Sequence, residues 1–249
     1  MNRIFTVCFL GPRSDILHAL QSIIKTKKIA FWQITDNRLL MAISWLGVYL
    51  VATSIVDIMQ SIFGVSIGRI EFENYLVEFV QLTAAPLSEE LGFRVLLIGL
   101  PMLLFLGNIS TAKDFFGFLW HPGRYSSKVN RKILAIIAFS ALFFGISHIT
   151  VSSGWEYGKI TQAAMGGMVL GWVYYRNGFP AALFIHWASN YGIFAHGFLG
   201  YALFGYEWFS SEQNLILGFL EVILTLIGVL VIIFYSYNFL RSRQTTLAK

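Results

Sequence analysis

Long apolar segments separated by short polar stretches make up most of the chain. A helix needs about 20 mostly apolar residues to cross the hydrocarbon core of a bilayer. Six segments are near or above that length, at residues 39–63, 72–106, 131–150, 159–176, 179–204 and 214–240. The pattern therefore predicts an all-α fold, a multi-pass transmembrane helix bundle of about six to seven spans.

The segment at 72–106 is too long for a single straight crossing. Pro86 lies inside it, and proline both removes a backbone donor and disfavours helical geometry at the preceding residue, Ala85. We expect a kink or a break near residues 84–87. A break there would divide the segment and raise the number of spans to seven.

The spans divide the chain into three regions. These are an N-terminal cytoplasmic segment at 1–38, a membrane-embedded domain at 39–240 and a basic cytoplasmic tail at 241–249. In the first region, apolar residues recur at helical spacing between 14 and 30 and lysines follow them, which predicts an amphipathic helix. That helix would lie on the inner membrane surface or pack against the bundle.

Small residues recur at every fourth position in the span at 159–176, as Ala163, Gly167 and Gly171. Such a stripe lets another helix approach closely, either within the chain or in a second copy. The sequence favours packing within the chain and leaves the oligomeric state open.

Composition and charge agree with a membrane protein. Of the 249 residues, 56% are hydrophobic and 12% are charged, about half the charged share of a soluble domain. The net charge of +5 could suit nucleic acid, but 15 of the 18 Lys and Arg residues lie in predicted loops and tails on one side of the spans. Arg69 and Lys159 fall on the other side, and Arg94 lies within a span. This asymmetry satisfies the positive-inside rule with both termini in the cytoplasm. We expect a protein of the cell membrane that contacts lipid and binds no nucleic acid.

Two adjacent acids and an arginine stand inside the second apolar segment, as Glu89, Glu90 and Arg94. Charges in hydrocarbon are costly, so such residues tend to be paired or functional. Glu90 and Arg94 are four residues apart and share a helix face, which predicts an ion pair. Glu89 points about 100° away around the helix and is left without that partner.

Two other spans also carry polar side chains. His148 lies near the end of the third span, and His186 and Asn190 share one face of the fifth. Because hydrocarbon cannot satisfy these groups, we expect them to turn inward and meet the two acids in one cavity.

These residue types suit a hydrolytic centre. A carboxylate and a histidine can hold and deprotonate a water molecule. A second histidine and an amide can donate hydrogen bonds to a developing oxyanion. Two alternatives stay open: a zinc ion held by Glu89, Glu90, His148 and His186, and a non-enzymatic transporter or scaffold whose polar cluster binds an ion or braces the helices.

The chain resembles the CPBP group of intramembrane proteases, which includes type II CAAX prenyl endopeptidases and bacteriocin-immunity relatives. The resemblance covers about residues 75–195 and rests on the blocks Glu89-Glu90-x-x-x-Arg94, Phe144-x-x-x-His148 and His186-x-x-x-Asn190. Val95 stands where the family often has glycine.

The resemblance implies an all-helical membrane endopeptidase whose substrate is a peptide or a lipidated protein, cleaved near the membrane surface. It implies that Glu89 and His148 activate water and that His186 and Asn190 form the oxyanion site. Glu90 and Arg94 would support them. No cofactor is expected, with zinc as the alternative.

The predicted depths of the two histidines conflict with this site. If the third span starts at Arg131, helix rise places His148 about 25 Å from the cytoplasmic side. His186 would be only about 10 Å deep by the same rise. The two can meet only if the third span projects into the cytoplasm, tilts strongly or ends early.

Overall fold

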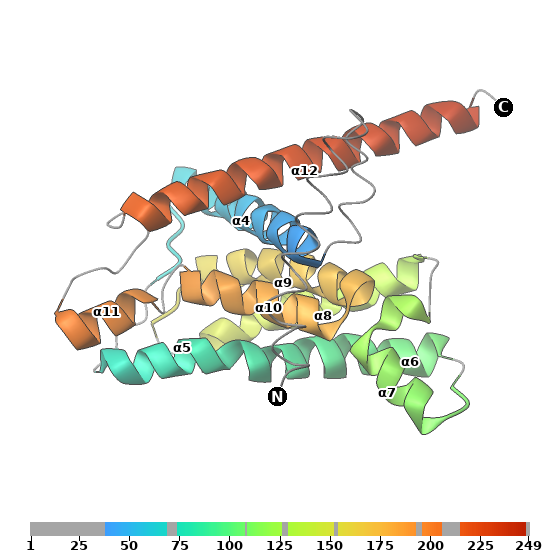
Figure 1. The fold of residues 1–249 in the computed structure, drawn as a ribbon, viewed down its shortest axis with the longest axis horizontal. Coiled ribbons are helices and arrows are strands. Elements are labelled where there is room, and N and C mark those ends of the chain that lie inside the picture. Colours follow the sequence, from blue (N-terminus) through green and yellow to red (C-terminus); the bar gives the residue numbers. More distant parts are fainter. Residues whose placement is uncertain are drawn as a thin grey trace, which may run out of the picture.

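A computed structural model describes residues 38–68, 74–107, 109–125, 129–151, 154–192, 196–205 and 215–247. These residues form helices and, apart from an isolated bridge between Gly68 and Trp155, no β-structure. Figure 1 shows them packed side by side as a helical bundle, which confirms the predicted fold class. The helix expected within 14–30 lies outside the described residues. The elements are α4 (Arg38–Ile62), α5 (Tyr75–Glu89), η2 (Glu90–Gly99), α6 (Leu100–Leu106), α7 (Ala112–Trp120), η3 (Pro122–Arg124), α8 (Arg131–Val151), α9 (Gly158–Asn177), α10 (Phe179–Asn190), α11 (His196–Phe204) and α12 (Leu215–Leu247).

Three of these helices are long and apolar enough to cross a membrane by themselves. They are α4, α8 and the part of α12 at Gly218–Leu240. The helix α12 continues to Leu247, so the region predicted as a basic tail begins as an extension of the last span. The protein is an integral membrane protein.

The predicted break at residues 84–87 is wrong, because the helix runs through Pro86. The N–H of Glu90 reaches the carbonyls of both Pro86 and Leu87. From Glu90 the helix widens to π geometry, and the N–H of Leu100 bonds the carbonyl of Val95, five residues back. The chain thus departs from α-helical geometry four residues after the proline, at the second of the two acids.

The span predicted at 179–204 is two helices rather than one. α10 ends at Asn190 and α11 begins at His196. Gly192 lies just beyond the end of α10, and glycine is among the least favourable residues for continuing a helix.

The stripe of small residues on α9 packs within the chain, as predicted. A Cβ atom added at Gly167 would meet Ala141 of α8, and one added at Gly171 would meet Ile137 of α8 and Ile98 of η2. On the other side of α9, Gly166 lies against the ring of Tyr49 from α4. α9 is therefore in close contact with helices on both sides.

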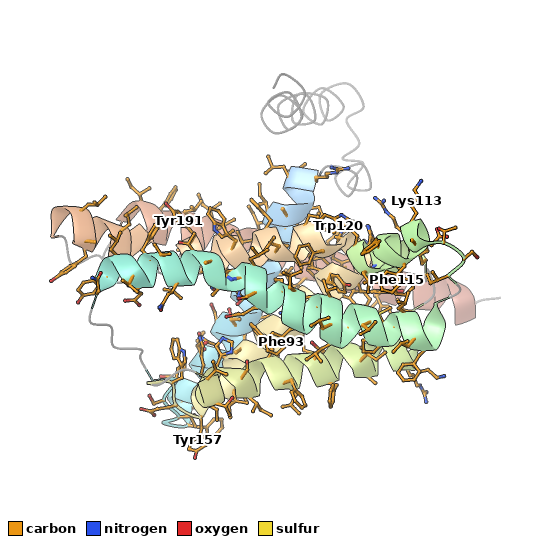
Figure 2. The ribbon with its side chains drawn as sticks, turned by 90° about the horizontal axis from the view of Figure 1, so that it is seen from below. Phe93, Lys113, Phe115, Trp120, Tyr157 and Tyr191 are labelled. Atoms are coloured by element: carbon orange, nitrogen blue, oxygen red, sulfur yellow. The ribbon has the colours of Figure 1, made fainter. Side chains whose placement is uncertain are left out.

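Contacts between loops define two ends of the bundle. At one end, which we call the basic end, the segment at 109–125 packs on the turn between α9 and α10. There Tyr174 donates a hydrogen bond to the carbonyl of Leu119 (2.6 Å). At the other, the distal end, Gln60 of α4 donates to the carbonyl of Gly158 (2.7 Å). Figure 2 shows Lys113 and Trp120 at the basic end and Tyr157 at the distal end.

The apolar core lies toward the basic end. It takes residues from η2, α6, α7, α8, α9 and α10 and includes Ile98, Met102, Phe118, Ile133, Ile137, Leu170, Val173, Phe179, Ala182 and Ile185. All of these side chains are at most 5% exposed.

Candidate active site

Glu90 and Arg94 form the predicted ion pair. The Nε atom of Arg94 lies 3.1 Å from Oε2 of Glu90, and both side chains are fully buried. Glu90 opens the π-helical segment η2, which carries both residues on one face. The guanidinium of Arg94 also lies over the ring of Phe144, 4.8 Å from its centroid.

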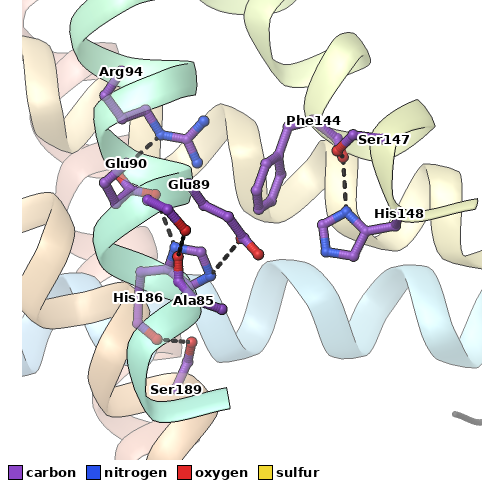
Figure 3. Close-up of polar contacts among 10 residues, drawn as sticks. Ala85, Glu89, Glu90, Arg94, Phe144, Ser147, His148, His186 and Ser189 are labelled. Atoms are coloured by element: carbon purple, nitrogen blue, oxygen red, sulfur yellow. Dashed lines mark hydrogen bonds and ion pairs between the residues drawn. The ribbon is translucent and has the colours of Figure 1, made fainter. Parts of the chain in front are cut away.

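His186 lies between the two adjacent acids, as Figure 3 shows. Its Nδ1 atom is 2.8 Å from Oε1 of Glu90, and its Nε2 atom is 3.5 Å from Oε2 of Glu89. Glu89, which the helix spacing separates from Arg94, therefore has a contact from α10 instead. The spacing of residues along one helix cannot reveal a contact with a residue 97 positions later.

The two acids differ in exposure, although they are neighbours in the sequence. The side chain of Glu89 is 29% exposed, whereas that of Glu90 is fully buried. Successive residues on a helix point about 100° apart. Glu90 consequently points into the bundle, and Glu89 lies at its edge.

His148 is held by its own helix. Its Nδ1 atom lies 2.7 Å from the carbonyl oxygen of Phe144. A carbonyl can only accept, so Nδ1 carries the hydrogen, and in the neutral ring Nε2 then has a lone pair. Figure 3 shows the His148 ring across the Phe144 ring from Glu89 and His186.

Phe144 connects all of these groups. Its ring centroid is 4.8 Å from that of His148 and 5.7 Å from that of His186. Both imidazoles therefore meet at one aromatic ring. The two histidines are thus near each other, although their predicted depths along the spans differ. Sequence reasoning found Phe144 as part of a motif but gave it no role.

Asn190 is the last residue of α10 and lies one turn beyond His186, where it is half-buried. The ion pairs and hydrogen bonds that join the acids, the arginine and His186 do not include it. The structure thus brings Glu89, Glu90, Arg94, His148 and His186 together and leaves Asn190 beside them.

Two further residues, which sequence reasoning missed, hold α10 in place. Ser189 donates a hydrogen bond to the carbonyl of His186 (2.8 Å), and the hydroxyl of Tyr49 is hydrogen-bonded to Ser189. Tyr49 comes from α4, whose sequence reads as an ordinary apolar span. No pattern in the sequence marks it.

The geometry of the donor set bears on zinc, the alternative that the sequence left open. Within the residues that the structure describes, no group of three or more His, Cys, Asp and Glu side chains is arranged to hold a metal ion. We therefore assign no step of the reaction to a metal ion.

Comparison with known proteins identifies the region that holds these side chains. Residues 72–192 match a family model described as type II CAAX prenyl endopeptidase Rce1-like. Searches of curated proteins and of solved structures gave no match. The matched region contains all three sequence blocks of the site and excludes α4, α11 and α12. Through residues 72–192, the chain is thus similar to the Rce1-like type II CAAX prenyl endopeptidases, in agreement with the resemblance seen in its sequence blocks.

Proposed function

We propose that this membrane protease is an endopeptidase that cleaves peptide bonds near the membrane surface with a water molecule activated by Glu89 and His148. The substrate is a peptide or a lipidated protein, processed near its C-terminus in the manner of CAAX proteins. The observation that carries the proposal is the row Glu89, His186, Glu90 and Arg94, with His148 beside it. In this row, the carboxylate of Glu89 and the Nε2 lone pair of His148 lie at the edge of a cluster whose buried members pair with one another.

In this mechanism Glu89 acts as the general base. It is the acid with the longer ionic contact, 3.5 Å to His186, and with a partly exposed side chain. His148 assists because the bond from its Nδ1 to Phe144 leaves Nε2 free to accept a hydrogen bond from the same water. The water attacks the scissile carbonyl and passes a proton to Glu89, and the leaving amine later takes up that proton.

His186 and Asn190 serve as donors to the oxyanion. Both ring nitrogens of His186 face carboxylate oxygens, an arrangement that an imidazolium satisfies by donating from both atoms. Of the two contacts, the one from Nε2 to Glu89 is the longer at 3.5 Å, and in the proposed mechanism the Nε2–H turns from Glu89 to the substrate oxygen as charge develops there. The amide of Asn190 adds a second donor one helical turn away.

Glu90 and Arg94 position His186 and do not touch the substrate. Glu90 orients the imidazole through Nδ1, and Arg94 balances the charge of Glu90.

The test is hydrolysis of a prenylated CAAX peptide by the purified protein, comparing Glu89→Gln with wild type. Glu89→Gln keeps the shape of the side chain and loses the base, so turnover should disappear while the melting temperature stays close to that of wild type. Glu221→Gln on α12 is the matched control and should retain turnover. If Glu89→Gln retains near-normal activity, another residue is the base. If wild type hydrolyses no such peptide, the CAAX assignment is wrong.

A further inference from the structure

A chain of two hydrogen bonds joins α4 to the backbone of His186. The hydroxyl of Ser189 donates to the carbonyl of His186 (2.8 Å), as Figure 3 shows, so its single hydrogen is already used. In the hydrogen bond between Ser189 and Tyr49, the hydroxyl of Tyr49 must therefore be the donor. The chain thus runs in one direction, from Tyr49 through Ser189 to His186.

Gly166 of α9 makes room for the ring of Tyr49. A Cβ atom at Gly166 would lie 2.9 Å from both Cε2 and the hydroxyl oxygen of Tyr49, which is closer than real Cβ atoms come. The ring of Tyr49 is therefore in direct contact with α9, while its hydroxyl reaches α10. Packing of this kind leaves few voids into which the ring could move.

The backbone of α4 is held on the side opposite Tyr49. Gly47 of α4 faces Gly228 of α12 so closely that a Cβ atom at Gly47 would lie 2.8 Å from the nitrogen of Gly228. Residues two apart on a helix point about 200° from each other. Gly47 therefore faces α12 while Tyr49 faces α9 and α10, and α12 holds α4 against these two helices.

His186 needs such a fixed point because it lies near the end of its helix. α10 ends at Asn190, one turn beyond His186, and helix ends fray. The His186 ring must nevertheless meet carboxylates from another segment, with Nδ1 2.8 Å from Glu90 and Nε2 3.5 Å from Glu89. A serine that bonds a carbonyl of the preceding turn can bend a helix, so the position of Ser189 affects where this turn lies.

We propose that Tyr49 is a positioning residue for the reaction. Through Ser189 it fixes the last turn of α10, and it thereby holds the ring of His186 where the Nε2–H can turn to the substrate oxygen. The inference rests on the proposed function in taking His186 as an oxyanion donor. It adds to the site a residue of α4, a helix outside the residues 72–192 that match the family model.

Two variants disturb Tyr49 in different ways. Tyr49→Phe removes only the hydroxyl, whereas Gly166→Ala keeps the hydroxyl and displaces the ring. Each has a matched control at the basic end. Tyr174→Phe removes a hydroxyl that donates to the carbonyl of Leu119, and Gly117→Ala places a methyl group against the hydroxyl of Tyr125.

The first measurement is hydrolysis of a prenylated CAAX peptide by the purified full chain in detergent, at a temperature below the melting transition of every variant. Tyr49→Phe and Gly166→Ala should each lower kcat by about 10–10²-fold, because a misplacement of about 1 Å can cost about 10²-fold. KM should stay close to that of wild type, since the oxyanion donors act in the transition state. Both controls should keep kcat and KM. Wild-type kcat in Tyr49→Phe, or a change in KM alone, would overturn the proposal.

A double variant tests whether Tyr49 acts through Ser189. Residues that act in one chain have effects that do not add. In a Ser189→Ala background, Tyr49→Phe should therefore lower kcat no further. If the two losses multiply instead, Tyr49 acts by another route and the proposal is overturned.

NMR spectroscopy with isotope-labelled histidine gives a signal that needs no turnover. The ring C–H signal of His186 is assigned by its loss in His186→Gln. This signal should shift in Tyr49→Phe and in Gly166→Ala, and it should keep its position in both controls. An unshifted signal in Tyr49→Phe would overturn the proposal. The expected shifts, together with no hydrolysis by wild type, would refute the proposed function and still support the positioning of His186 by Tyr49.

Discussion

Removing the charge of Arg94 should destabilise the protein far more than an ordinary substitution. Arg94 and Glu90 are fully buried and 3.1 Å apart. In Arg94→Ala, Glu90 stays fully buried, loses the guanidinium and keeps His186 as its one close partner. Losing one member of a buried ion pair costs about 3–5 kcal/mol. The lost contact with the Phe144 ring adds about 0.5–2 kcal/mol.

The assay is thermal unfolding of the purified protein in detergent. In a chain of this size, each kcal/mol of lost unfolding free energy lowers the melting temperature by about 2–4 °C. The loss of the ion pair alone should therefore lower it by about 6–20 °C. Arg176→Ala is the matched control. Its side chain is exposed at the end of α9, and such substitutions change stability by no more than about 0.5 kcal/mol.

A double variant separates the charge effect from the loss of volume. Glu90→Gln with Arg94→Met removes both charges and keeps most of the packing, and replacing a buried pair in this way is often neutral. The double variant should therefore melt well above Arg94→Ala. The buried-charge reasoning is refuted if Arg94→Ala has the same melting temperature as wild type. It is also refuted if the double variant is no more stable than Arg94→Ala.

The remaining predictions concern the reaction and pH. His186→Ala and Asn190→Ala should each lower the hydrolysis rate by about 10²–10³-fold, as expected for one lost oxyanion donor; a negligible effect of Asn190→Ala alone would remove it from the site. Thorough chelation should leave activity intact, and finding stoichiometric zinc that is lost together with activity would make His148 and His186 ligands instead. At the basic end, burial lowers the pKa of His121, the charge of Arg124 adds to this, and the hydrogen bond to the carbonyl of Arg176 opposes it. The folded state thus favours the neutral ring. The contribution of His121 to the free energy of unfolding is present above the unfolded pKa of about 6.5, and it is lost as the pH falls through the lowered pKa of the folded state. Between about pH 7 and about pH 5, the melting temperature of wild type should therefore fall further than that of His121→Gln. Equal falls in the two proteins would contradict this.

Contacts within one helix could be predicted from the sequence, because helical geometry alone determines them. Glu90 and Arg94 are four residues apart, and their ion pair follows from that spacing. The stripe on α9 indicated close helix packing for the same reason. Apolar length gave most helix boundaries to within a few residues.

Contacts between helices could not be predicted in this way. The position of His186 between the two acids depends on how α10 crosses η2, and no local pattern encodes that crossing. The bond from Tyr49 to Ser189 joins helices that lie far apart in the sequence. The π-helical segment was missed because Pro86 suggested a break, whereas the helix absorbed the lost donor and widened only at Glu90.

The order of the two acids explains why the site needs both. Glu90 has two close partners, Arg94 at 3.1 Å and His186 at 2.8 Å, and is fully buried, so it is bound too tightly to take a proton from water. Glu89 has one partner at 3.5 Å and a side chain that is 29% exposed. In the proposed mechanism the buried acid fixes His186, and the exposed acid reacts. Because neighbouring helical residues point about 100° apart, two adjacent glutamates are enough to produce both environments. Exchanging the roles would require the helix to rotate, which the bond between Arg94 and Glu90 opposes.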